Sequence, residues 1–255
     1  MSDRDLVRAA LAAVDRGDSV VVATVVETER SVPRHAGSKM LVFADGRSTG
    51  SIGGGEMEAR VIGIAGEVLA SGDPRLVTFD LVDPAVGDPG VCGGSVSLYL
   101  EPLLPEASVV IVGCGHVGRA VVDLAHWLGY RVTAVDDRTD LATAEQVPTA
   151  DHVMVGPVGD VIAQVAVTDR THIVLVTRNM AVDLDAIPAA LKTPARSIGV
   201  MGSTRRWAQT RERLIERGIA PQQLDRVRSP IGLEIDAETP EQIALSIMAE
   251  ITSLD

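Results

Sequence analysis

The chain has 255 residues, of which 46% are hydrophobic and 23% charged, a composition typical of a globular protein and not of a disordered one. Its formal net charge of −12 repels phosphate backbones and anionic lipid headgroups, so we expect neither nucleic acid nor a membrane surface as a partner. Two cysteines cannot form a disulfide scaffold, and the polar amino terminus without a long apolar run predicts a cytoplasmic protein.

The first part of the chain, residues 1–104, is predicted to be a small α/β domain. Apolar residues from Leu6 to Val14 recur at helical spacing, so we expect an amphipathic helix over 3–16. The Val-rich segment 19–26 predicts a buried strand. The remaining expected elements are a strand at 38–43, a helix at 56–70, and strands at 75–81 and 95–101, with a Gly-, Pro- and Asp-rich loop at 82–94.

A seam with two prolines near 102–106 precedes a second predicted domain, residues 107–255. Short strands alternate with helices here, which predicts a Rossmann-like, doubly wound parallel sheet. The expected strands are 109–112, 131–136, 152–155, 171–177 and 196–201, and the expected helices are 116–128, 158–167, 182–192, 203–218 and 240–253. The last helix should begin with a capping box formed by Thr239 and Gln242. The last two helices could serve intramolecular packing or a homodimer surface.

The segment Gly113-Cys114-Gly115-His116-Val117-Gly118 directly follows an apolar strand and opens a helix, which is the context of a dinucleotide-binding fingerprint. Gly113 would permit the tight turn, Gly115 would let the backbone approach a pyrophosphate, and Gly118 would let helix and strand pack closely. His116 would either face solvent or touch the ligand. Cys114 would either have a pKa lowered by the helix N-terminus or fill space as a small buried residue.

Asp136 ends the next strand and would accept hydrogen bonds from a ribose 2′-hydroxyl, which favours NAD(H) over NADP. Two alternatives stay open: a different phosphorylated ligand, or a domain that serves only as a packing scaffold.

Two further segments in the first domain combine glycine with charge. The loop 31–40 places Arg34, His35 and Lys39 close together, as a cationic site or as ordinary solvated charges. In the segment 50–58, the run Gly53-Gly54-Gly55 fits a turn with positive φ whose N–H groups face a ligand. Glu58 would accept hydrogen bonds from a heterocycle such as a pterin, or would simply start the helix.

Two more segments are candidates for ligand contacts. Ser203 is a predicted helix N-cap followed by Arg205 and Arg206, which oppose the helix dipole unless an anion docks there or surface carboxylates pair with them. Cys92, beside two glycines, is sterically open and could ligate a metal or carry sulfur, or could be a small residue at a strand start. No recognised catalytic motif accompanies these segments.

In this order the motifs resemble the XdhC/CoxI family of xanthine dehydrogenase accessory proteins, over nearly the whole chain. Departures from the family pattern occur at Glu56, Thr204 and Trp207. The matching segments are 23–26, 31–34, 37–40, 50–55 with Glu58, 92–94, 100–103, 113–118, 135–138, 199–206, 229–233 and 237–251.

The resemblance implies a chaperone that binds the molybdenum cofactor, supports its sulfuration with a cysteine desulfurase and inserts it into a xanthine or CO dehydrogenase-type molybdenum hydroxylase. It implies phosphate contacts from Arg205, Arg206 and the loop 113–118, pterin contacts from Lys39 and Glu58, and a metal or sulfur contact from Cys92. The alternatives are an NAD-dependent oxidoreductase and a nucleotide-sensing regulatory protein without turnover.

Overall fold

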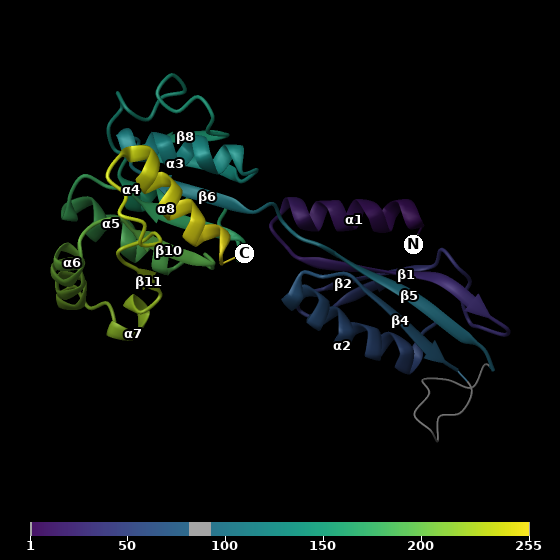
Figure 1. Ribbon diagram of the computed structural model, residues 1–255. Coiled ribbons are helices and arrows are strands. Elements are labelled where there is room, and N and C mark those ends of the chain that lie inside the picture. Colours follow the sequence, from purple (N-terminus) through teal and green to yellow (C-terminus); the bar gives the residue numbers. More distant parts are fainter. Residues whose placement is uncertain (1, 82–92, 255) are drawn as a thin grey trace. The chain divides into compact units, whose positions relative to one another are not determined.

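The computed structural model describes residues 2–81 and 93–254, and the chain divides into two compact units, one ending at Pro105 and the other beginning at Glu106 (Figure 1). No helix of the described residues is long and apolar enough to cross a lipid bilayer.

The first unit is built on an antiparallel sheet with the strand order β3-β2-β1-β5-β4. Its strands are β1 (Val20–Glu29), β2 (Lys39–Phe43), β3 (Ser48–Gly50), β4 (Arg75–Asp80) and β5 (Ser95–Leu103). Alternate residues of β1 face opposite sides, so each face of the sheet needs its own apolar cover. Helix α2 (Gly55–Ser71) packs on the face that includes Val21, and α1 (Asp3–Asp15) packs on the face that includes Val20 (Figure 1).

The second unit contains a parallel sheet with the strand order β11-β10-β9-β6-β7-β8. Its strands are β6 (Ser108–Val112), β7 (Arg131–Asp136), β8 (His152–Val155), β9 (Thr171–Leu175), β10 (Ser197–Val200) and β11 (Val227–Arg228). Its helices are α3 (His116–Trp127), α4 (Val158–Ile162), α5 (Met180–Leu191), α6 (Thr204–Glu216), α7 (Pro221–Leu224) and α8 (Pro240–Thr252). Because β6 pairs with β7 on one side and β9 on the other, the sheet is doubly wound about β6, as predicted.

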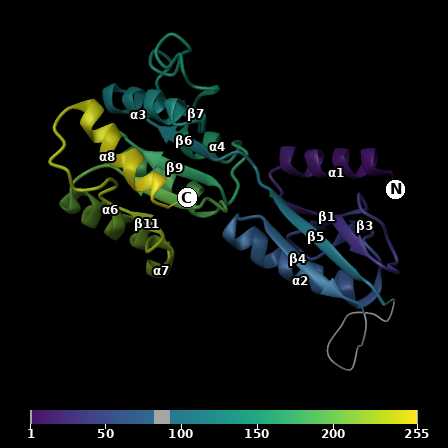
Figure 2. The ribbon, with the colours of Figure 1, turned by 45° about the vertical axis from the view of Figure 1, so that its right-hand side comes forward.

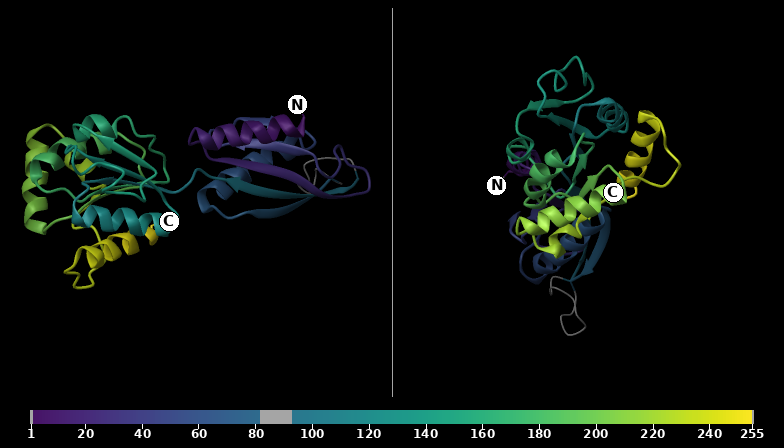
Figure 3. Two further views of the ribbon diagram at one scale, coloured as in Figure 1. Left: turned by 90° about the horizontal axis from the view of Figure 1, so that it is seen from above. Right: turned by 90° about the vertical axis from the view of Figure 1, so that its left-hand side faces the viewer.

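Helices cover both faces of this sheet (Figure 2). Residues of α4, α5 and α6 share one apolar cluster with the strands, while α3 and α8 share the other. Figure 3 shows α3 and α8 side by side on one face, and the apolar residues of α8, including Ile247 and Ile251, are buried within this unit. The alternative of intramolecular packing therefore holds for α8.

The ends of two helices test the sequence reading. The capping box at α8 is confirmed, because Thr239 Oγ1 accepts from the Gln242 N–H and the Gln242 side chain accepts from the Thr239 N–H. Helix α4 ends at Ile162 and not at residue 167, although Val165 and Val167 still pack against the core from the turns that follow. The apolar residues after Ile162 therefore indicate that this segment is packed against the core, but they do not indicate that it is helical.

Candidate functional site

The fingerprint turn between β6 and α3 has the geometry that its glycines predict. Gly113 has φ +110°, and a Cβ there would lie 2.7 Å from the Val176 carbonyl oxygen. A Cβ on Gly118 would lie 1.7 Å from the Gly113 carbonyl oxygen, whereas a Cβ on Gly115 would meet nothing within 4 Å. No side chain caps α3 at Gly115. The predicted turn at Gly113 and the close packing at Gly118 are confirmed, while the approach of a pyrophosphate to the open backbone at Gly115 stays a prediction.

Asp136 is 2% exposed and fixes this turn. Its carboxylate accepts from the Cys114 N–H (2.7 Å) and from Arg138 Nε and Nη2 (2.9 and 2.8 Å). Burial alone would raise the pKa of Asp136, but the hydrogen bonds from Arg138 and Cys114 lower it to about 2. The carboxylate is thus ionised and already engaged, so a ribose at this acid, as predicted from the sequence, would have to compete with Arg138.

Cys114 corrects one alternative of the sequence analysis. Its side chain is fully buried, and burial together with the charge of Asp136 raises the pKa of the thiol to about 12. The prediction that the helix N-terminus lowers the pKa of Cys114 is therefore wrong, and Cys114 is a small buried residue that fills space.

We expect Cys114 to resist alkylation in the folded protein. At about pH 8 only roughly 10⁻⁴ of a thiol with this pKa is thiolate, and burial blocks access as well. The test uses a Cys92→Ala variant, in which Cys114 is the remaining cysteine. Iodoacetamide should label the native chain roughly 100-fold or more slower than the same chain unfolded in guanidinium, because the thiolate fraction of Cys114 is much smaller in the native chain. Equal rates in the two states would contradict the burial of this thiol.

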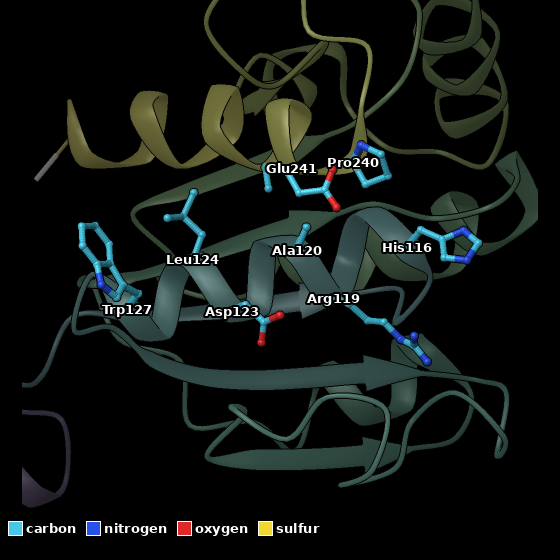
Figure 4. Close-up of a pocket in the computed structure, with 9 residues that line it drawn as sticks. His116, Arg119, Ala120, Asp123, Leu124, Trp127, Pro240 and Glu241 are labelled. Carbon is cyan, nitrogen blue, oxygen red and sulfur yellow. The ribbon is translucent and has the colours of Figure 1, made fainter.

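His116 is exposed and lines a groove of about 580 Å³ between α3 and α8, together with Arg119 and Trp127 (Figure 4). Trp127, at the other end of α3, is 78% exposed. A ligand contact of His116 stays a prediction.

Arg178, which sequence reasoning missed, reaches across the carboxyl ends of the strands. It follows β9 and donates from Nη1 and Nη2 to both carboxylate oxygens of Asp137, at 2.6 and 2.8 Å. Asp137 follows β7, so this ion pair spans the switch point of the sheet, where folds of this class bind ligands. The available signal was its position, directly after the strand expected over 171–177.

Ser203 and the arginines after it form a second group at the carboxyl edge. The predicted N-cap is confirmed, because Ser203 Oγ accepts from the Arg206 N–H. Arg206 turns inward: its Nη2 lies 2.5 Å from Oδ2 of fully buried Asp183 and 2.7 Å from Thr177 Oγ1. Arg205 is exposed. Of the two alternatives for Arg206, an anion site or a pair with a carboxylate, the structure shows the pair, although the carboxylate is buried and not on the surface.

The glycine run of the first unit forms the turn before α2. Gly53, Gly54 and Gly55 have φ values of +146°, +85° and +63°. Glu58 Oε1 accepts from the Ser51 hydroxyl and from the N–H groups of Ile52 and Gly54. Partial burial opposes the effect, but these hydrogen bonds lower the pKa of Glu58. Glu58 thus organises the glycine turn as well as starting the helix.

Three predicted segments of the first unit meet at this turn. The Ser51 N–H donates to the Lys39 carbonyl oxygen (3.0 Å), and a Cβ on Gly53 would lie 2.8 Å from Pro33 Cγ. A Cβ on Gly94 would lie 2.5 Å from the Ser31 carbonyl oxygen. The loop 31–40, the segment 50–58 and the end of the segment 92–94 therefore share one corner, which we call the glycine corner.

The loop 31–40 carries the residues of the predicted cationic site. Lys39 Nζ donates to Thr24 Oγ1 (3.0 Å), and Arg34 and His35 are exposed. Cys92, the predicted metal or sulfur contact, lies outside the described residues. Within the described residues, no group of three or more His, Cys, Asp or Glu side chains could hold a metal ion.

Comparisons with known proteins match both units. The family model described as the XdhC Rossmann domain matches residues 109–251, and the model of the XdhC and CoxI family matches residues 13–80. A crystal structure described as a xanthine dehydrogenase from Bacillus halodurans matches this chain with 23% identity and a TM-score of 0.53. The match covers 100% of this chain and 96% of the chain in that structure. That likeness supports the fold.

Two curated relatives come from Escherichia coli (strain K12). The uncharacterized protein YqeB is 30% identical over 234 residues, covering 90% of this chain, which in turn spans only 42% of the length of YqeB. The molybdenum cofactor insertion chaperone PaoD is 23% identical over 282 residues, covering 98% of this chain and 88% of PaoD.

Proposed function

Because the chain belongs to the XdhC and CoxI family, we propose that it binds the molybdenum cofactor and assists the maturation of a xanthine dehydrogenase-type molybdenum hydroxylase. The likeness to PaoD, which extends over 98% of the chain, supports insertion of the cofactor as the role. Such a role requires binding and release, and it does not require a catalytic group.

The glycine corner is the observation that carries this proposal. Its segments are far apart in the sequence, and the fold of the first unit brings them together through Pro33, Gly53 and Gly94. A Cβ at Gly54 or Gly55 would meet nothing within 4 Å, so the backbone of this turn is open on one side. The N–H groups of Ile52 and Gly54 already donate to Glu58 Oε1 and that of Gly53 donates to Ser51 Oγ, so what this turn offers a ligand is the open space beside Gly54 and Gly55.

Lys39 and Glu58 are the proposed pterin contacts of the first unit. Lys39 donates from a charged amine, and within the described residues the hydrogen bond of its Nζ goes to the neutral Thr24. Glu58 uses Oε1 for all its recorded bonds within the described chain, which leaves Oε2 to accept from a pterin N–H. We propose that Cys92, which directly precedes Gly93-Gly94, contacts the molybdenum or carries the sulfur.

The proposal extends to the second unit and to protein partners. The loop 113–118, Ser203 and the exposed Arg205 are proposed contacts for a phosphate group, while Arg206 acts through Asp183 as a positioning residue. A cysteine desulfurase is the proposed source of sulfur for the cofactor, and a molybdenum hydroxylase is the proposed recipient.

The experiment is anaerobic equilibrium binding of isolated molybdenum cofactor and of NADH, side by side, to the full chain. We expect the cofactor to bind and NADH to bind negligibly. Lys39→Ala should weaken cofactor binding by about 10-fold, the loss expected for one charge-assisted hydrogen bond. Cys92→Ala should bind poorly or fail to support sulfuration.

Lys192→Ala is the matched control, because Lys192 is the one other lysine of the chain and is exposed at the end of α5. It should bind the cofactor as the wild type does. Saturable NADH binding without cofactor binding would overturn the proposal in favour of an oxidoreductase or a nucleotide sensor.

A further inference from the structure

A groove of about 580 Å³ lies between α3 and the start of α8 in the second unit (Figure 4). The residues of α3 that line it recur every three or four positions, so they form one stripe along the helix, which we call the α3 stripe. They are His116, Arg119, Ala120, Asp123, Leu124 and Trp127. The stripe is about 16 Å long at the rise of an α-helix, which is long enough to pack against a second helix.

Trp127, at one end of the α3 stripe, is 78% exposed, more than any other large apolar side chain that the structure describes. Such a side chain holds a large apolar area in water, and tryptophan is enriched among the residues that contribute most to protein–protein binding. Ala120, near the middle of the stripe, and Ala244 of α8 are small, so another helix can approach the groove closely. The groove therefore has the features of a protein interface.

The α3 stripe also carries a guanidinium and a carboxylate on one side. Arg119 and Asp123 project from the side of α3 that faces away from α8 (Figure 4). They lie one helical turn apart, yet Arg119 has no ion-pair partner within the described residues. Asp123 accepts from Thr149 through Oδ1, and its Oδ2 has no such bond in the part of the chain that the structure describes. Both charges are therefore available to an external partner.

The order of residues along the α3 stripe is complementary to that of a second copy in antiparallel orientation. A two-fold axis midway along the stripe places the two α3 helices face to face, and every contact then occurs twice. In this register His116 faces Trp127 of the second copy. Arg119 faces Leu124 of the second copy and reaches the adjacent Asp123. The axis keeps Arg119 and Asp123 on the same side of the two helices, so each guanidinium meets a carboxylate.

We infer that the chain forms a homodimer through the α3 stripe, with two antiparallel α3 helices at its centre and the first turns of α8 at its edge. A second copy fits because the Arg119–Asp123 contact forms twice, whereas an unrelated helix would have to supply both charges independently. The net charge of −12 does not exclude such a dimer, because exposed charges farther apart than about 8 Å are largely screened at physiological salt. The inference does not rest on the proposed function.

Glu241 is the acid of the groove that this register leaves without a cation. It lies in the first turn of α8, and the two-fold axis keeps both copies of α8 on the same side of the interface. Glu241→Gln should therefore tighten the dimer about twofold, because it removes two like charges from this edge. A dimer that this substitution weakens would contradict the register.

Sedimentation velocity of the full chain at micromolar concentrations tests the inference by charge reversal. The wild type should be a dimer. Arg119→Asp and Asp123→Arg should each weaken self-association by at least about 10-fold, because each substitution puts like charges into both contacts. An equimolar mixture of the two variants should dimerise to within about threefold of the wild type, because both contacts then pair opposite charges again.

Trp127→Ala should weaken the dimer by at least about 10-fold, as expected for a tryptophan in an interface. Leu76→Ala is the matched control, because Leu76 is 63% exposed on β4 of the first unit. Its loss should change self-association by less than about twofold. Far-ultraviolet circular dichroism shows whether each variant is folded.

Three results would overturn the inference: a wild type that is monomeric at all these concentrations, a dimer that the single charge reversals leave unchanged, or a mixture of the two variants that stays monomeric. If the wild type is monomeric and Trp127→Ala loses binding to a purified molybdenum hydroxylase, the groove is an interface with that enzyme and not with a second copy.

Discussion

Replacing Gly118 with alanine is expected to lower the free energy of unfolding of the second unit by about 3 kcal/mol or more. The new Cβ would lie 1.7 Å from the Gly113 carbonyl oxygen and 2.8 Å from the Gly113 carbonyl carbon, and both are backbone atoms. They can yield only if α3 moves away from β6, which would open the apolar cluster that holds Val121 and Val122. Urea unfolding followed by circular dichroism measures the effect.

Gly115→Ala is the matched control in the same loop. Gly115 has φ −74°, which any residue can adopt, and its Cβ would meet nothing within 4 Å. Its unfolding free energy should change by no more than about 0.5 kcal/mol. Equal stabilities of the two variants would show that α3 is not packed against the turn as described.

Most elements of the second unit could be predicted because its central strands are buried on both faces and appear as continuous apolar runs, such as residues 109–112. The glycine fingerprint added the turn and the following helix. Strands β3 and β11 and helix α7 were missed, since segments of two to four residues are too short to show periodicity. The family resemblance, which depends on the order of motifs, is confirmed by two family models.

The partners of the charged residues could not be predicted, because they depend on tertiary contacts. Asp183 lies 23 positions before Arg206, and Asp137 lies 41 positions before Arg178. For Cys114 the sequence indicated a helix N-terminus but not the depth of burial or the neighbouring Asp136, and these two raise its pKa. Local sequence thus identifies glycine turns and caps well, but it does not show which arginine is free to bind an anion.

Asp183→Ala is expected to lower the free energy of unfolding by about 3–5 kcal/mol, the typical cost of breaking a buried ion pair from one side. Asp183 is 0% exposed, and its carboxylate holds both Thr177 Oγ1 and Arg206. Removing it leaves the Arg206 guanidinium, 25% exposed, without its carboxylate partner. Asp225→Ala, which breaks the exposed pair with Arg211, is the matched control and should cost at most about 1 kcal/mol.

A double-mutant cycle separates the ion pair from other effects of the substitution. Arg206→Ala alone leaves a buried carboxylate without its guanidinium, so it should also be costly, and the double variant should cost clearly less than the two single costs added together. A coupling energy below about 0.5 kcal/mol would contradict the contact between these side chains. Because Arg206 also donates to the Thr177 carbonyl oxygen, the same variants should loosen the β9–α5 connection. The buried pair thus stabilises the unit by tying α6 to the connection between β9 and α5 through Thr177 and Asp183.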